Sequence, residues 1–233
     1  VNLVLNARDA MPDGGAIQIT TSRQDPWGIM AVQDHGCGMN PADAALSIER
    51  HTTSKIRSSA DLNSLSTYGF RGEALPCIAS VSKFKVSTRA SDHGSGTVIA
   101  VEGGRVLAQE ECGRAVGTSI EVRDIFFNVP ARLKFLKSED SERSKILRTF
   151  EECAVARPEI AFELRTGKRK PQEYPARKDP LQRILDFWGE VLGPGDLLPL
   201  RFDHPYLKVT GWVSKPEAHR PTKTTQIFYV NRR

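Results

Sequence analysis

Hydrophobic and polar positions alternate with a period of two along much of the chain, which is the pattern of half-buried strands. The alternating segments are rich in β-branched residues and are bounded by glycine, proline or asparagine. We expect strands at 16–22, 28–34, 83–89, 97–102, 105–110, 117–123, 161–165, 207–213 and 225–230. The glycine pair 103–104 separates two of these segments and predicts a tight hairpin turn.

Other segments carry apolar residues three and four positions apart, which is helical spacing. We expect helices at 1–10, 41–50, 73–80 and 140–156, and another beginning at 179–180. Pro41 directly follows Asn40, a proline position typical of the first turn of a helix. Because helices and antiparallel strands mix without a regular βαβ repeat, the pattern predicts an α+β fold.

Two stretches show neither the two-residue period of strands nor the spacing of helices. Residues 52–72 are polar and carry glycine, and so long a loop in a compact domain is usually functional. Residues 166–180 are basic and carry proline, which suggests a linker. The chain begins without methionine and its final strand-like run stops abruptly, so we interpret it as a fragment of a longer protein.

Composition narrows the class of protein. The chain has 233 residues, 39% hydrophobic and 26% charged, with no apolar run of membrane length and no signal peptide. Its four cysteines are widely spaced without a CxxC pair, which argues against zinc or disulfides and fits a cytoplasmic protein. The net charge is +5, and basic residues concentrate at 168–170 and after Ser214. Such clusters attract polyanions, although solvated surface faces explain them equally well.

The opening helix carries unusual chemistry. Asn2, Asn6 and Asp9 fall on one helical face, two amides and a carboxylate together. The side-chain oxygen of Asn6 suits Mg²⁺, which prefers oxygen ligands and often shares them with substrate phosphates. This face would look onto a nucleotide.

A second motif, DHGCG at 34–38, follows the strand at 28–34 directly. A largely buried Asp34 could accept a hydrogen bond from an exocyclic amino group such as that of adenine. Gly36 and Gly38 would let the backbone approach a flat ligand. A turn capped by the aspartate side chain explains the motif without any ligand.

Two loops offer phosphate contacts. In YGFRGEAL at 68–75, two glycines and Arg71 precede a helix, and exposed amides with the helix dipole attract anions. In RHTTSKI at 50–56, two hydroxyls and a lysine could bind phosphate. A hinge and an ordinary surface segment are the alternatives. The chain contains no Walker A motif.

Together these motifs resemble the N-terminal ATPase region of the MutL family of DNA mismatch repair proteins, which belongs to the gyrase, Hsp90, histidine kinase and MutL (GHKL) superfamily. The similarity covers nearly the whole chain. It rests on the stretches NARDA, DHGCGM, RHTTSKI, YGFRGEALPCIASVS, VGTSIEVRDIFFNVPARLKFLKS and FYVNRR, in this order. The resemblance implies a GHKL-type (Bergerat) α/β sandwich over 1–175 and a partial ribosomal-protein-S5-like domain over 176–233.

The resemblance also implies the cofactors ATP and Mg²⁺ and a role for each matching residue. Asn6 matches the magnesium ligand and Asp34 the residue that binds adenine. The remaining implied nucleotide contacts are Gly36, Gly38, Thr53, Ser54, Lys55, Gly69, Phe70, Arg71, Gly72, Glu73, Ala74, Leu75 and Thr118. Arg232 and Arg233 are implied to meet DNA.

One position departs from the family. The glutamate that acts as general base in MutL is replaced by Asn2, and an amide cannot take a proton from water. The first fifteen residues are instead similar to the N box of histidine kinases. Slow or impaired hydrolysis is therefore expected. A histidine-kinase-type ATP-binding domain and a non-catalytic DNA-binding module are the alternative functions.

The family resemblance implies several partners for the full-length protein. They are DNA, bound without sequence preference and in a salt-sensitive way, other mismatch repair proteins, and a second copy of the protein in a homodimer. No membrane partner is expected. Because contacts to phosphates release counterions, DNA affinity is expected to fall as salt rises.

Overall fold

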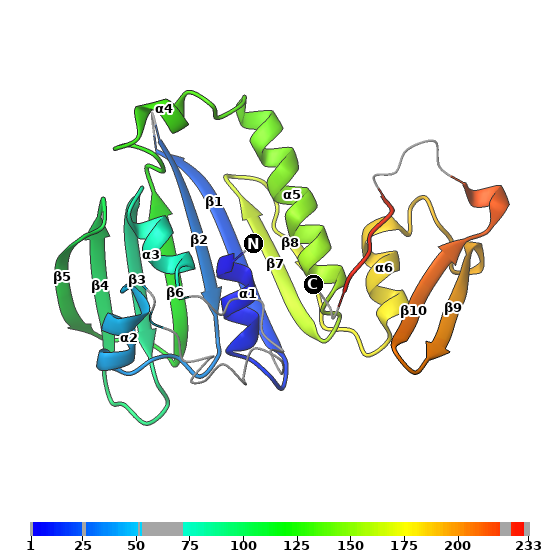
Figure 1. The fold of residues 1–233 in the computed structure, drawn as a ribbon, viewed down its shortest axis with the longest axis horizontal. Helices are drawn as coiled ribbons and strands as arrows, with labels where there is room; N and C mark the ends of the chain where they lie inside the picture. Colours follow the sequence, from blue (N-terminus) through cyan, green and yellow to red (C-terminus); the bar gives the residue numbers. More distant parts are fainter. Residues whose placement is uncertain (1, 25–26, 51, 53–71, 220–224, 231–233) are drawn as a thin grey trace.

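The computed structural model describes residues 2–24, 27–50, 52, 72–219 and 225–230. Two sheets organise these residues, one of eight strands and one of two (Figure 1). Every predicted strand up to residue 213 is present within about two residues, so the α+β prediction is confirmed. The described part of the chain contains no helix long and apolar enough to cross a membrane.

The large sheet is mixed. In space the strands run in the order β5-β4-β3-β6-β2-β1-β7-β8, and every neighbouring pair is antiparallel except the parallel pair β1 and β7. Its strands are β1 (Gly15–Gln24), β2 (Trp27–Asp34), β3 (Lys83–Arg89), β4 (Gly96–Glu102), β5 (Arg105–Cys112), β6 (Gly117–Arg123), β7 (Ile160–Thr166) and β8 (Gln172–Tyr174). The small sheet is the antiparallel hairpin of β9 (Leu197–His204) and β10 (Leu207–Ser214).

Helices cover one face of the large sheet (Figure 1). The α-helices are α1 (Asn2–Asp9), α2 (Pro41–Ser47), α3 (Ala74–Ala79), α4 (Pro130–Leu133), α5 (Glu139–Val155) and α6 (Pro180–Trp188), with 3₁₀ helices η2 (Pro194–Asp196) and η3 (Pro216–Ala218). The side chain of Asn40 accepts a hydrogen bond from Asp43 N–H, and that of Asp179 accepts one from Leu181 N–H. These caps fix where α2 and α6 begin.

The core lies between the helices and this face of the sheet. Alternate residues of each central strand are buried there, which is why the two-residue period located the strands. In β3, for example, Phe84 and Val86 are 2% and 0% exposed, whereas Lys83 and Lys85 are exposed on the other face. The helix-covered face is therefore the inner face of the molecule.

Helix α6 is fastened to the large sheet. The rings of Phe187 and Tyr174 stack with centroids 4.1 Å apart, and both lie near Phe150 of α5. The wholly buried Arg183 donates through Nη2 to the carbonyls of Pro158, Ile160 and Pro175, at 3.2, 2.7 and 2.9 Å. The division into 1–175 and 176–233 stays a prediction.

Three sequence expectations need correction. Residues 225–230 do not form a strand: this segment makes no ladder with any described strand, and the Tyr229 hydroxyl instead donates to the Glu152 carbonyl at 2.6 Å. The predicted linker contains strand β8. Strand β9 was not predicted, because Pro199 weakens a strand pattern and is tolerated here only in a two-stranded sheet.

Candidate functional site

A row of buried polar side chains crosses the inner face of the large sheet at one end. Asp34 of β2 lies opposite Thr118 of β6, Thr118 opposite Thr88 of β3, and Thr88 opposite Thr97 of β4. All four side chains are at most 8% exposed. Buried polar groups on an otherwise apolar face need hydrogen-bond partners from the protein, water or a ligand. We call these four residues the Asp34 row and take them as a candidate site.

The Asp34 carboxylate is half satisfied by the protein. Its Oδ1 accepts hydrogen bonds from Gly36 N–H at 2.9 Å and Thr118 N–H at 3.3 Å. Within the described residues nothing donates to Oδ2. Burial raises the pKa of this carboxyl, and the two amides and nearby Arg114 oppose that rise. A carboxylate oxygen has lone pairs to spare, so Oδ2 can accept a hydrogen bond from a ligand.

The glycines of the DHGCG motif pack closely against protein backbone, and their predicted approach to a ligand stays a prediction. A Cβ on Gly36 would come within 2.6 Å of the Cβ and the carbonyl oxygen of Ala10, and Cys37 N–H donates to that carbonyl at 3.2 Å. Gly38 has φ +67°, and a Cβ there would collide with the Arg89 carbonyl. Both glycines let the motif pack against protein backbone, at the end of α1 and of β3.

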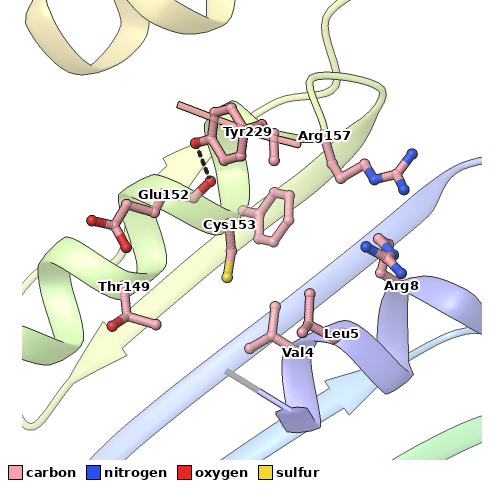
Figure 2. Close-up of a pocket in the computed structure, with 10 residues that line it drawn as sticks. Val4, Leu5, Arg8, Thr149, Glu152, Cys153, Arg157 and Tyr229 are labelled. Atoms are coloured by element: carbon pink, nitrogen blue, oxygen red, sulfur yellow. Dashed lines mark hydrogen bonds between the residues drawn. The ribbon is translucent and has the colours of Figure 1, made fainter. Parts of the chain in front are cut away.

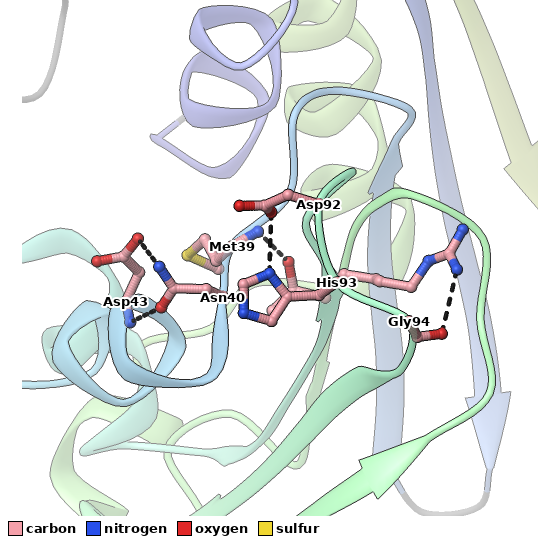
Figure 3. Close-up of polar contacts among 8 residues, drawn as sticks. Met39, Asn40, Asp43, Asp92, His93 and Gly94 are labelled. Atoms are coloured by element: carbon pink, nitrogen blue, oxygen red, sulfur yellow. Dashed lines mark hydrogen bonds and ion pairs between the residues drawn. The ribbon is translucent and has the colours of Figure 1, made fainter.

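Thr88 joins the parts of this site and was missed from the sequence. Its hydroxyl accepts a hydrogen bond from Met39 N–H at 2.9 Å. Met39 directly precedes Asn40, whose side chain caps α2 through Asp43 (Figure 3). The Thr88 hydroxyl oxygen also lies 3.1 Å from Thr118 Oγ1 and 3.3 Å from the Gly117 carbonyl oxygen. The available signal was a polar residue at a buried position of the period Phe84, Val86, Thr88.

The polar face of α1 stays a prediction as a ligand-binding surface. Asn2 is exposed, and Asn6 and Asp9 are half-buried. Arg8 Nε donates to Asp9 Oδ1 at 2.8 Å, so Asp9 is engaged by its neighbour rather than offered to a ligand. Asn6 and Asn2 thus stay as the candidates from this face.

The phosphate loop is described only at its end. Gly72 has φ +62°, Glu73 precedes α3 without capping it, and Ala74 begins that helix, followed by Leu75. The other predicted contacts lie outside the described residues. They are Thr53, Ser54, Lys55, Gly69, Phe70 and Arg71, together with the DNA candidates Arg232 and Arg233.

A separate pocket of about 140 Å³ lies between α1, α5 and β7 (Figure 2). Val4, Leu5 and Phe162 give it apolar walls, and Arg8 and Arg157 supply guanidinium groups. None of the residues that line it is a predicted site residue. The Asp34 row remains the better candidate, because it carries a carboxylate oxygen, Oδ2, to which no described residue donates a hydrogen bond.

The comparisons with known proteins identify the family of the chain. Residues 1–123 match the family model for "Histidine kinase-, DNA gyrase B-, and HSP90-like ATPase". The computed structure is similar to the Aquifex aeolicus MutL ATPase domain complexed with ADP, with TM-score 0.65 and 30% identity, covering 86% of this chain and 69% of that one. The chain belongs to the MutL ATPase-domain family.

Curated MutL proteins extend the similarity over the rest of the chain. Those of Symbiobacterium thermophilum and a Geobacter species are 40% and 42% identical over 99% of this chain. The chain spans only 36% and 35% of those relatives. The N-terminal domain of a DNA repair protein shares the fold, with TM-score 0.77, at 23% identity, covering 100% of this chain and 73% of that one. The family resemblance inferred from the sequence motifs is confirmed.

The family model and the MutL relatives match different lengths of the chain, and they differ beyond the end of β6. The family model stops at Arg123, so it spans the Asp34 row but not α4, α5 or the β9–β10 hairpin. MutL relatives match this later part as well. A histidine-kinase-type domain would not account for that later match, which favours MutL over the first alternative.

Proposed function

We propose that this MutL-family chain binds ATP and acts as a nucleotide-dependent switch in DNA mismatch repair. The observation that carries the proposal is the buried Asp34 carboxylate, which has two amide donors on Oδ1 and none among the described residues on Oδ2. The amino group of adenine is a donor of the right kind for Oδ2. The ADP complex of the Aquifex relative supports a nucleotide as the ligand.

The proposed roles follow the chemistry of each side chain. Asp34 accepts from adenine, and Thr118 supports Asp34 through its N–H. Asn6 supplies an oxygen for Mg²⁺, an ion that takes few protein ligands and completes its shell with phosphates and water. The described residues hold no group of three or more His, Cys, Asp or Glu side chains that could bind a metal by themselves. When bound, Mg²⁺ would neutralise phosphate charge.

The other predicted contacts extend this proposal to the phosphates. Gly36 and Gly38 position the DHGCG turn and let its backbone approach the nucleotide. The phosphates are assigned to Thr53, Ser54, Lys55 and the segment Gly69, Phe70, Arg71, Gly72, Glu73, Ala74 and Leu75. Glycines and amides ahead of α3 would supply donors without added bulk.

We propose slow turnover for this chain. Asn2 stands where the family has its general base, and its exposed amide has no proton affinity near neutral pH. Binding of ATP rather than its hydrolysis would then set the state of the switch. In the full-length protein that state would favour homodimerisation and contact with other repair proteins. DNA would be bound without sequence preference, in part by Arg232 and Arg233 in a second domain over 176–233.

Thermal unfolding tests this function directly. A ligand at 100 times its Kd stabilises the folded state by about 2.7 kcal/mol. For a chain of this size we expect ATP with Mg²⁺ to raise Tm by about 5 to 10 °C. DNA binding without any nucleotide-induced shift would contradict the proposal and favour the non-catalytic DNA-binding module.

Thr88 provides a second prediction. Thr88→Val keeps the shape of the side chain but leaves Met39 N–H without its acceptor, so we expect a loss of about 1 to 3 kcal/mol in unfolding free energy. Because the same hydroxyl holds the DHGCG turn beside Thr118, ADP affinity is expected to fall about tenfold. Thr88→Ser keeps the hydroxyl and is the matched control. Denaturant titration and calorimetry measure the two effects, and wild-type affinity in Thr88→Val would contradict the assigned role.

A further inference from the structure

The pocket between α1, α5 and β7 combines apolar walls with two guanidinium groups. Val4 and Leu5 of α1 and Phe162 of β7 supply the apolar surface. Arg8 of α1 and Arg157, which follows α5, extend their side chains to the same end of the pocket (Figure 2). This arrangement suits a molecule with an apolar body and an anionic group.

The pocket has room for a small organic molecule. Its volume of about 140 Å³ is close to the roughly 150 Å³ of an engineered apolar cavity in another protein that binds benzene. Cys153, Ala156 and Arg157 line it from the end of α5, at positions three and four apart that share one helical face. A benzene ring with one substituent therefore fits the pocket by size.

One edge of the Arg157 guanidinium is unused by the described residues. Its Nη1 donates to Glu159 Oε1 at 3.4 Å. Its Nε is buried and has no hydrogen-bond partner in the described part of the chain. Because a buried donor without an acceptor costs free energy, a ligand oxygen beside Nε would be stabilising.

The corresponding edge of another arginine in this chain holds a carboxylate. Arg177 donates to Asp186 through Nε at 2.9 Å and through Nη2 at 2.7 Å, the two-bond geometry in which a guanidinium matches a carboxylate. Arg8 already uses its Nε and Nη2 for Asp9. Arg157 is therefore the residue of this pocket that can bind the carboxylate of a ligand.

The acidic residue that lines the pocket is engaged by other donors. The carboxylate of Glu152 accepts from Arg148 Nε at 2.9 Å. Its backbone carbonyl accepts from the Tyr229 hydroxyl at 2.6 Å and from Ala156 N–H at 3.2 Å. An anion bound at Arg157 would therefore not face an unpaired acidic group among the residues that line the pocket.

We propose that this pocket binds a small carboxylate with an apolar body, held through Nε and Nη2 of Arg157. Charge-assisted hydrogen bonds to a guanidinium would fix the carboxylate, and burial against the apolar walls would stabilise the body. An inorganic anion would leave those walls without a partner. The site goes beyond the proposed function, since none of its residues belongs to the nucleotide site or to the DNA contacts proposed at Arg232 and Arg233.

The test is an NMR titration of the chain with benzoate, and benzamide is the uncharged control of the same shape. Loss of a charged hydrogen bond weakens binding by about 10- to 150-fold, which is the difference expected between benzoate and benzamide in wild type. Arg157→Met should lose the same factor for benzoate. Arg169→Met removes an exposed arginine outside the pocket and should bind benzoate within about twofold of wild type.

Arg157→Lys keeps the charge but lacks the two-bond edge, so it should also bind benzoate more weakly than wild type. This second variant decides the matter if Arg157→Met does not fold. Equal affinity of wild type for benzoate and benzamide, or wild-type affinity for benzoate in either Arg157 variant, would overturn the proposal.

Alkylation of Cys153 shows whether benzoate binds in this pocket. Its thiol lines the pocket, and burial raises its pKa, so its reaction is slow enough to follow. Benzoate at about ten times its Kd should slow this reaction about tenfold by occupying the pocket. The exposed Cys77 of α3 should react at an unchanged rate in the same sample. Full reactivity of Cys153 with benzoate bound would place the ligand elsewhere and contradict the proposed site.

Discussion

Asp34→Asn is expected to weaken ATP binding by about 100-fold or more while the chain stays folded. The amide oxygen of asparagine can still accept from Gly36 N–H and Thr118 N–H, so the turn keeps both of its hydrogen bonds. The NH₂ group would then face the amino group of adenine, donor against donor. A lost charged hydrogen bond costs about 1.5 to 3 kcal/mol, and an opposed donor adds to that cost. Calorimetric titration with ATP and Mg²⁺ measures the loss.

The thermal stability of nucleotide-free Asp34→Asn shows whether the variant is still folded, and so serves as the control for its ATP binding. Burial raises the pKa of Asp34 in the folded chain, so its protonated form contributes stability at low pH that is lost as pH rises through the folded pKa. Asparagine is uncharged at every pH and avoids that loss. Near pH 7 the nucleotide-free variant should therefore show a Tm equal to or above that of wild type. A variant that binds ATP as wild type does would remove Asp34 from the site.

Asn2→Glu is expected to raise the rate of ATP hydrolysis by about 10²- to 10⁴-fold, the usual contribution of a general base. Asn2 is exposed in the first turn of α1, where a carboxylate fits the helix dipole, so the substitution should leave stability nearly unchanged. Phosphate release at saturating ATP measures the rate. ATP affinity should change little, because Asn2 is assigned no role in binding.

Asn2→Gln is the matched control for this experiment. It lengthens the side chain as glutamate does but supplies no base, and its hydrolysis rate should equal that of wild type. Equal rates in wild type and Asn2→Glu would show that the missing carboxylate is not what limits turnover. A rise in Asn2→Gln as large as that in Asn2→Glu would attribute the effect to side-chain length.

The central strands could be predicted because one face of the sheet is buried and the other is not. In β3, for example, Phe84 and Val86 lie on the buried face and alternate with lysines on the exposed face. The run 225–230 shows the limit of the same argument. Its β-branched and aromatic residues are typical of a strand as well. A strand exists only with a partner, however, and here the Tyr229 hydroxyl bonds to α5 instead. Pairing is a tertiary property that one segment does not encode.

The candidate site was predictable where a motif is local. Asp34 and the two glycines are adjacent in sequence, and the strand before them fixes where the carboxylate lies. Thr88 was missed because its role depends on cross-strand register, which brings it opposite Thr118 from 30 positions away. The sequence could not show that the two glycines also pack against Ala10 and Arg89, because these residues are distant in sequence.

The central claim is that the Asp34 row selects adenine, and paired titrations of the wild-type chain with ADP and GDP test it most directly. Guanine carries a carbonyl oxygen where adenine carries its amino group, which would set two acceptors against each other at Asp34 Oδ2. We predict measurable binding of ADP with Mg²⁺ and affinity for GDP weaker by about 100-fold or more. No binding of ADP, or equal affinity for the two nucleotides, would contradict the account.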